Sequence, residues 1–364
     1  MRNLKMTVCL LVGILLAWPV FFGESLLAAK PEFTLRYADP TAPTGAKGKG
    51  FTYAIEKIEK DSNGRIAIEP YWSSSLMKTQ ETLTGLKNGV ADIAFICTSW
   101  YSSQLPANQL PWLLFDAPSG EGIYDFQRRL FSEIPELKEE LRSWNQKWLS
   151  PAFAGDISGV CTVKNVTSFD GLKGLKIRSG GGLARPRQVK AMGAVSVEMA
   201  FIECASGLQS GVIEGVYTGL DCAHRDGLLD AAPYWFAIPK GTSSGHNYIA
   251  INIDTWNKLP PDLQKIVQDG FVAGWKCFSD TMIGQLNYIN DNVIKGFKWI
   301  TNEEYQRYMA SPYIMEIEKY GVEQTKKKIP NAEAILSKIK EISKELGGGD
   351  WVKLMEIQKA WLKK

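Results

Sequence analysis

The stretch GLKNGVAD at residues 85–92 returns, without a gap, as GLQSGVIE at residues 207–214. In each copy a helical pattern ends, a glycine supplies the cap, and a buried strand that carries an acidic residue begins. Two interpretations are open. The likeness could be chance between two common helix-to-strand turns, or the two halves of the chain could form related lobes that each deliver a strand to a shared cleft.

Strand and helix patterns alternate on both sides of these two stretches. Strands are predicted at 33–37, 66–71, 90–97, 174–178, 195–199 and 212–218. Helices are predicted from Phe51 to a stop signal at 61–64 and at 77–87, 183–192 and 201–209, whereas 38–50, with its prolines and glycines, reads as a loop. This alternation predicts βαβ units and a largely parallel sheet, and hence an α/β fold.

The chain after Trp256 is mainly helical by pattern. A long helix is predicted from Leu259 to about Ile294, followed by helices at 303–320, 332–346 and 351–362. Such helices more often hold two lobes together than provide catalytic or binding residues. We expect a signal peptide at 1–29, lobe I at 30–154 with 245–275 returning to it, lobe II at 155–244, and bridging and C-terminal helices at 276–364.

The first residues indicate the compartment. Arg2 and Lys5 precede an uncharged, mostly apolar run at 6–23, and Ala28 and Ala29 then offer small residues for signal peptidase. This pattern is typical of a secretory signal that is removed before folding, and we expect the mature protein, from about Lys30, in the periplasm. A retained membrane anchor is the alternative.

Charge and cysteine content bear on nucleic-acid binding and on disulfides. The mature chain is nearly balanced, with 40 basic and 38 acidic side chains, so nothing points to nucleic acid. Five cysteines remain after processing, at positions 97, 161, 204, 222 and 277. An odd number cannot pair completely, and no two have C-x-x-C spacing. They are either small buried hydrophobes or include one disulfide.

Two common motifs of metal-dependent and nucleotide-dependent enzymes are missing from the sequence. There is no H-E-x-x-H or Walker loop, and the two histidines, His224 and His246, are too few for a typical zinc site. We therefore predict a protein that is not an enzyme and has neither a cofactor nor a metal site. Paired carboxylates that meet only in space would leave an exported enzyme open as an alternative.

Ligands of open α/β sheets bind beyond the carboxyl ends of the strands, and three places meet that condition. Thr98, Ser99 and Trp100 follow the strand that ends at Cys97 and offer hydroxyl groups and an aromatic face to an organic ligand. A polar loop with aromatic rings packed beneath it would have the same composition.

The second place is Arg178, at the end of a predicted strand and before a triple glycine and a helix start. Its guanidinium could hold a carboxylate through two parallel hydrogen bonds, and the helix N-terminus favours the same charge. A surface ion pair is the alternative role. Arg185 and Arg187, on the following helix, are expected to face solvent.

The third place is Tyr217, Thr218 and Asp221, at the end of the strand at 212–218. In the repeat, this strand corresponds to the one at 90–97. Asp221 would repel an anion, so we expect it to bind a hydroxyl group, an amino group or Arg178 itself.

Several stretches, taken together and in order, resemble one family. They are LTGLKNGVAD at 83–92, GLKGLKIR at 171–178, MGA at 192–194, LQSGVIEG at 208–215 and WNKLP at 256–260. The chain resembles the solute-binding proteins of tripartite ATP-independent periplasmic (TRAP) transporters, from about Phe33 to Lys340. The resemblance implies a two-lobed, periplasmic-binding-protein-like clamp with a long bridging helix, which closes on its ligand like a Venus flytrap.

The resemblance also implies a function. The family's hallmark arginine, which pairs with a substrate carboxylate, falls on Arg178. We therefore expect capture of a small organic anion, delivery to the membrane subunits of a TRAP permease, and a monomer rather than a dimer. A ligand-sensing module for a receptor would use the same clamp.

One departure from the family bears on the ligand. Many carboxylate-binding members have Glu-Asn-Pro where this chain has YTG at 217–219, which argues against the usual C4-dicarboxylate and sialic-acid ligands. Aromatic residues at Trp100 and Tyr217, with Trp72 and Phe153, indicate a larger or more apolar acid. His246 completes the residues expected at the ligand.

Overall fold

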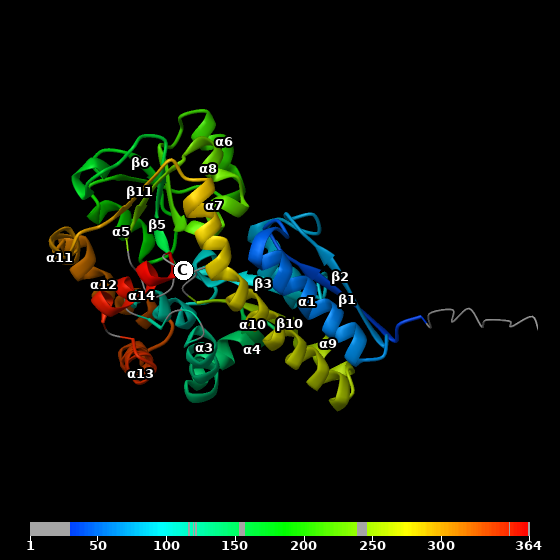
Figure 1. Ribbon diagram of the computed structural model, residues 1–364. Helices are drawn as coiled ribbons and strands as arrows, with labels where there is room; N and C mark the ends of the chain where they lie inside the picture. The colour runs from blue at the N-terminus through cyan, green and yellow to red at the C-terminus, as the bar shows by residue number, and fades with distance from the viewer. Residues whose placement is uncertain are drawn as a thin grey trace, which may run out of the picture.

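The computed structural model describes residues 30–362 apart from Asp116, Ser119, Glu121, 153–156, 239–245 and Gly349. The strands of this part form two sheets, each with its own helices, and the long helix α10 (Pro261–Asn292) runs past both (Figure 1). We call the five-stranded sheet with its helices the first lobe and the six-stranded sheet with its helices the second lobe. The predicted signal peptide at 1–29 lies outside the described residues.

The first sheet has the strand order β2-β1-β3-β10-β4. Its strands are β1 (Phe33–Ala38), β2 (Ile66–Tyr71), β3 (Ile93–Cys97), β4 (Gln146–Pro151) and β10 (Asn247–Asn252). β1 is parallel to β2 and β3, whereas β10 is antiparallel to β3 and β4. Pro70 is tolerated near the end of β2 because that strand lies at the sheet edge.

The second sheet has the order β11-β9-β5-β8-β6-β7. Its strands are β5 (Ser158–Thr162), β6 (Lys176–Arg178), β7 (Val195–Val197), β8 (Gly215–Gly219), β9 (Tyr234–Ala237) and β11 (Gly296–Trp299). β6 is parallel to β7 and β8, and β11 is parallel to β9, whereas β5 is antiparallel to its two neighbours.

Helices cover the sheets and connect them. The first lobe carries α1 (Gly45–Asp61), η1 (Thr79–Glu81), α2 (Thr82–Lys87), η2 (Thr98–Tyr101), η3 (Ala107–Leu113), α3 (Gly122–Glu133), α4 (Pro135–Ser143) and α9 (Ile253–Lys258). The second carries η4 (Phe169–Leu172), α5 (Arg185–Ala191), η5 (Phe201–Glu203), α6 (Cys204–Gln209), α7 (Leu220–Arg225) and α8 (Leu228–Ala231). After α10 come α11 (Asn302–Met309), α12 (Pro312–Lys326), α13 (Ala332–Glu345) and α14 (Trp351–Trp361).

The alternation of strands and helices is confirmed, but the prediction of a largely parallel sheet is wrong, because both sheets are mixed. The chain passes from the first lobe to the second between β4 and β5 and returns between β9 and β10. All the antiparallel ladders involve β5 or β10, the strands that enter a lobe at these crossings. Five strands were not predicted from the sequence, namely β4, β5, β9, β10 and β11.

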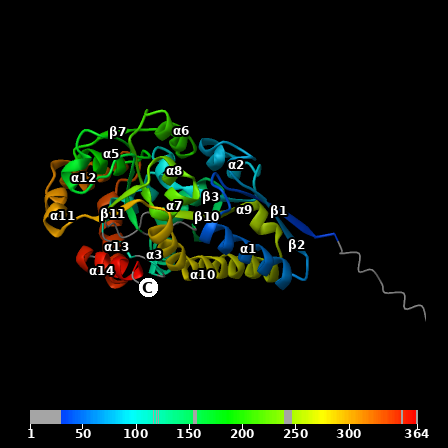
Figure 2. The same ribbon diagram turned by 45° about the horizontal axis from the view of Figure 1, so that its top comes forward.

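The loop predicted over 38–50 is wrong from Gly45 onward, where α1 begins. Glycines occur in its first turns because other backbone comes close. A Cβ on Gly48 would lie 2.0 Å from the carbonyl oxygen of Pro43, and one on Gly50 would lie 2.8 Å from that of Gly274 on α10. α1 and α10 therefore lie against each other along the first lobe (Figure 2).

The helices near the end of the chain contact both lobes, as predicted. The long helix expected at 259–294 is α10, which touches α1 and β4 of the first lobe and α7 of the second. α12 contacts η3 of the first lobe and α5 of the second. The single helix expected at 303–320 is divided into α11 and α12, because Pro312 starts a new helix.

Two further findings concern the cysteines and the helices. The five cysteines of the mature chain are free thiols, and Cys97, Cys161 and Cys204 are buried, which agrees with small buried hydrophobes. Across the residues that the structure describes, every helix is too short or too polar to span a bilayer.

Candidate ligand-binding site

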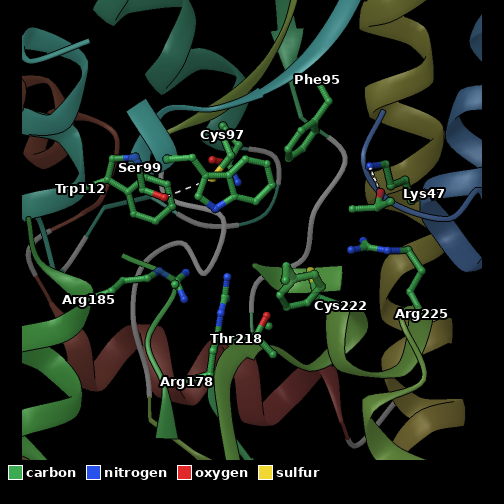
Figure 3. Close-up of a pocket in the computed structure, with 16 residues that line it drawn as sticks. Lys47, Phe95, Cys97, Ser99, Trp112, Arg178, Arg185, Thr218, Cys222 and Arg225 are labelled. Carbon is green, nitrogen blue, oxygen red and sulfur yellow. Dashed lines mark hydrogen bonds between the residues drawn. The ribbon is translucent and has the colours of Figure 1, made fainter. Parts of the chain in front are cut away.

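A cavity lies between the two lobes, beyond the carboxyl ends of β3, β6 and β8 (Figure 3). It encloses about 600 Å³ of space between atoms, including its opening to solvent. The first lobe contributes Thr41, Lys47, Phe95, Cys97, Ser99, Trp100, Trp112 and Asn247, and the second contributes Arg178, Gly180, Arg185, Phe201, Thr218, Gly219, Cys222 and Arg225. A ligand in this space would touch both lobes.

Arg178 ends β6 and reaches into this cavity, yet it is only 5% exposed. Its Nε donates to the backbone oxygen of Met199 at 3.2 Å, and its guanidinium lies 5.1 Å from the ring centre of Phe201. Burial lowers the pKa of Arg178, but an arginine starts so far above neutral pH that it stays charged. Among the described residues, no carboxylate forms an ion pair with it.

A glycine turn holds the Arg178 side chain in place. Gly180, Gly181 and Gly182 all have positive φ values, between 73° and 80°. A Cβ on Gly180 would lie 2.7 Å from Nη1 of Arg178, so a side chain there would displace the guanidinium. The triple glycine that the sequence left uninterpreted therefore gives the arginine room and turns the chain into α5.

Arg185 lies beside Arg178 at the same side of the cavity (Figure 3). Its guanidinium lies 5.3 Å from the ring centre of Trp112 and 5.2 Å from that of Tyr217, and Nη1 donates to the backbone oxygen of Tyr217 at 3.1 Å. The prediction that Arg185 faces solvent is wrong. Arg185 is the first residue of α5, which begins at the cleft, and its guanidinium packs against aromatic rings there. Arg187 lies instead on the ring of Tyr320, 3.3 Å from its centre.

Lys47 and Arg225 line the opposite side of the cavity (Figure 3). Their side chains are only 2% and 5% exposed. Lys47 forms an ion pair of 2.7 Å with Asp39, and Arg225 forms one of 2.7 Å with Asp226 and a longer one of 3.9 Å with Asp221. Carboxylates thus balance the charges of Lys47 and Arg225, whereas no carboxylate among the described residues pairs with Arg178.

Some of the predicted residues line the cavity and others support it. Ser99, Trp100 and Thr218 line it with Arg178. Thr98 is fully buried, where its hydroxyl donates to the His246 oxygen at 3.0 Å and accepts from Trp112 Nε1 at 2.7 Å. Thr98 therefore orients Trp112, which does line the cavity.

The remaining predicted residues stand behind the lining or away from it. Tyr217 lies under Arg185, and Asp221 is buried beside Arg225 rather than Arg178. Trp72 packs on Tyr37 and Phe51, with ring centres 5.4 and 4.9 Å apart. Phe153 lies outside the described residues.

His246 is fully buried in the first lobe. Its Nε2 shares a 2.8 Å hydrogen bond with Asn108 Oδ1, and its ring stacks on Phe131 at 5.1 Å. Burial lowers the pKa of His246 to about 3, so the ring is neutral at physiological pH. Its neighbours are structural, and it does not line the cavity.

The sequence analysis missed those lining residues whose side chains point into the cavity only because of tertiary packing. Lys47 stands in a segment predicted to be a loop, whereas Phe95 and Phe201 lie in a predicted strand and a predicted helix with no signal for a ligand. Trp112 and Arg225 carried no local signal.

A family model described as bacterial extracellular solute-binding protein, family 7, matches residues 37–273. The chain belongs to this family. The C4-dicarboxylate-binding periplasmic protein DctP of Rhodobacter capsulatus is 25% identical over 255 residues, which are 66% of this chain and 71% of that protein. A solute-binding protein of Verminephrobacter eiseniae is 23% identical over 259 residues, 68% of this chain and 73% of that one.

Solved structures of family members confirm the fold. The TRAP periplasmic solute-binding protein of Xanthobacter autotrophicus, with bound β-D-galacturonate, has a TM-score of 0.67 at 18% identity and covers 84% of this chain and 99% of its own. That of Desulfovibrio desulfuricans, with bound sn-glycerol-3-phosphate, has a TM-score of 0.67 at 17% identity and covers 85% and 97%. The resemblance to TRAP solute-binding proteins and the two-lobed α/β clamp are therefore confirmed.

Proposed function

We propose that this family 7 protein captures an organic carboxylate in the cavity between its lobes and delivers it to the membrane subunits of a TRAP transporter. The observation that carries the proposal is Arg178, a buried cation that lines the cavity without an ion-pair partner among the described residues. A buried charge needs a partner, and a ligand carboxylate would supply it through two parallel hydrogen bonds.

The lining favours a ligand with an apolar or aromatic body. Phe95, Trp100, Trp112 and Phe201 present rings to the cavity, whereas uncharged polar groups come mainly from Ser99, Thr218 and Asn247. Relatives in solved structures bind galacturonate and glycerol-3-phosphate, which carry several hydroxyl groups. Because four aromatic rings line the cavity beside its polar groups, we expect an acid with a larger apolar part.

The protein binds its ligand without turning it over. The thiols that line the cavity are poor nucleophiles, because burial raises the pKa of Cys97 and raises that of Cys222 to about 12. His246, buried and neutral, lies outside the lining. We also propose that the protein acts as a monomer.

The test is a thermal-shift screen of the mature chain, residues 30–364, against aliphatic, aromatic and sugar acids. A ligand that binds only the folded state raises the melting temperature. We expect a large shift with an apolar or aromatic acid, confirmed by titration calorimetry, and its loss in Arg178→Met.

Arg307→Met is the matched control, because it removes an exposed guanidinium that pairs with Asp170 at 3.3 Å, far along the chain from the cavity lining. It should keep the full shift. A carboxylic acid that binds equally well to wild type and Arg178→Met would contradict the proposed anchor.

A further inference from the structure

Arginines reach the cavity between the lobes from two opposite sides (Figure 3). Arg178, which ends β6, and Arg185, which begins α5, lie at one side. Arg225, the last residue of α7, lies at the other side, and its guanidinium points into the space between them. A ligand whose carboxylate binds to Arg178 would therefore extend toward Arg225.

The Arg225 guanidinium has donors that no protein oxygen satisfies. Its side chain is only 5% exposed. Nη2 lies 2.7 Å from Asp226 Oδ2, but Nη1 lies 3.9 Å from Asp221 Oδ2, which is beyond hydrogen-bond distance. A guanidinium carries five N–H donors, so most of those on Arg225 lack an acceptor within the part of the chain that the structure describes. An oxygen of a ligand in the cavity would supply one.

Lys47, at the same side of the cavity, is already bound (Figure 3). Its Nζ donates to Asp39 Oδ1 at 2.9 Å and to Thr41 Oγ1 at 2.5 Å, and it lies 4.6 Å from the ring centre of Phe95. An ammonium has only three donors, so these contacts leave Lys47 little capacity for a ligand. Arg225 is therefore the cation at this side that would donate to one.

The charge at the Arg225 side selects a neutral group of the ligand. Ion pairs there join two cations, Lys47 and Arg225, to three carboxylates, Asp39, Asp221 and Asp226. Negative charge is thus already in excess, and a second carboxylate of a ligand would increase it at a buried place, where charges interact strongly. A hydroxyl, carbonyl or ether oxygen accepts a hydrogen bond without adding charge.

We propose, on the basis of the carboxylate capture proposed above, that Arg225 determines the specificity of this cavity. The ligand is a monocarboxylate with an apolar or aromatic body and a neutral oxygen at its far end. Arg178 binds the carboxylate, and Arg225 donates to the neutral oxygen. Dicarboxylates of the same length bind more weakly, because their second charge meets the excess of carboxylates beside Arg225.

The test compares acids that differ only at the far end. The probes are benzoate, phenylacetate and 3-phenylpropionate, each with hydrogen, hydroxyl or carboxylate in the para position, measured by titration calorimetry. For the skeleton that binds most tightly, we expect the hydroxyl form to bind about 10-fold more tightly than the hydrogen form, as for one hydrogen bond to a charged group. The para-carboxylate form should bind more weakly than the hydroxyl form.

Arg225→Met should remove the preference for the hydroxyl form, because the variant lacks the donor that distinguishes the two acids. The ratio of the two affinities within one protein cancels any general effect of the substitution on the cavity, so a purely structural role would leave it unchanged. Arg307→Met, which removes an exposed guanidinium paired with Asp170, is the matched control and should keep the wild-type ratio.

Asp226→Asn tests the charge at this side in a variant that keeps Arg225. It removes one of the three carboxylates with little change of shape, so the para-carboxylate form should gain about 3- to 10-fold relative to the hydroxyl form. Asp170→Asn, at the exposed pair, should leave that ratio unchanged. If Arg225→Met fails to fold, this variant and the wild-type comparison decide the question.

Two results would overturn the role of Arg225: equal binding of the hydroxyl and hydrogen forms to wild type on every skeleton, or a preference that survives in Arg225→Met. Both leave the carboxylate capture intact, provided that the acids still depend on Arg178. Acids that bind Arg178→Met as tightly as wild type, or a complete lack of binding by carboxylic acids, would instead contradict the capture itself and the role of Arg225 with it.

Discussion

Ser99 of the first lobe and Gly182 of the second face each other across the cleft, and a Cβ on Gly182 would lie 3.2 Å from the Cβ of Ser99. Gly182 belongs to the turn that follows Arg178 and has a φ of +80°. The two lobes therefore meet where the anchor enters the cavity, and the smallest residue permits that contact.

Gly182→Ala should hold the lobes apart and weaken ligand binding. A distance of 3.2 Å is too short for ordinary packing, and the backbone of Ser99 is nearby at 3.4 Å. We expect an overpacking cost of about 1–3 kcal/mol in the closed form, and hence about 10-fold weaker binding. Small-angle scattering should show a smaller decrease in radius on adding ligand.

Gly181→Ala is the matched control for this contact. It has nearly the same backbone strain, with a φ of +73°, but the nearest atom to its new Cβ would be Glu198 Oε2 at 4.0 Å. If both variants bind equally weakly, strain in the turn rather than the contact with Ser99 would explain the loss.

Arg178→Lys should lose most of the affinity although it keeps the charge. A guanidinium presents two parallel donors to a carboxylate, whereas an ammonium is a point charge that cannot reproduce this geometry. We expect a loss of about 1.5 to 3 kcal/mol, measured by titration calorimetry with the acid found in the thermal-shift screen. Unchanged affinity in Arg178→Lys would mean that charge alone holds the ligand.

The repeat at 85–92 and 207–214 shows how much of the fold could be predicted from the sequence. Gly89 and Gly211 both cap a helix, with φ values of +71° and +74°. Asp92 accepts a hydrogen bond from the Arg36 backbone at 2.9 Å, and Glu214 accepts one from the Lys176 backbone at 3.2 Å. The repeat is therefore structural as well as sequential, and its two acids tie neighbouring strands together.

The candidate site was less predictable, because its cations depend on tertiary packing. Arg178 was accessible to sequence reasoning, since a strand end and a glycine turn define its place. The direction of Arg185 depends on rings from both lobes, Trp112 and Tyr217. Lys47 enters the cavity only because α1 begins earlier than its glycines and prolines suggested. No local pattern carries that information.

Close packing of α1 on α10 predicts opposite effects for two glycine substitutions. A Cβ on Gly50 would lie 2.8 Å from the Gly274 oxygen, whereas one on Gly284 would meet nothing within 4 Å. Gly50→Ala should destabilise the protein by about 1–3 kcal/mol. Gly284→Ala, in the exposed face of α10, should stabilise it by about 0.5–1 kcal/mol. Urea unfolding measures both, and destabilisation by Gly284→Ala as large as that by Gly50→Ala would refute the packing argument.

His246 should make the protein less stable in mild acid. Burial holds its pKa at about 3, against an ordinary value of 6.5. Between these two values the unfolded chain binds more protons than the folded one, so stability is complete above pH 6.5 and falls as the pH falls. At pH 5 we expect this residue alone to lower the free energy of unfolding by about 2 kcal/mol.

Urea unfolding at pH 7 and pH 5 tests this expectation in wild type and in His246→Gln, which cannot take up a proton at that position. The variant should be less stable at pH 7, because it disturbs the contacts with Asn108 and Phe131, but its stability should fall less between the two pH values. Since the remaining ionisable groups are the same in both proteins, the difference between the two pH slopes belongs to His246. Equal slopes would mean that His246 takes up its proton in the folded state as readily as in the unfolded state.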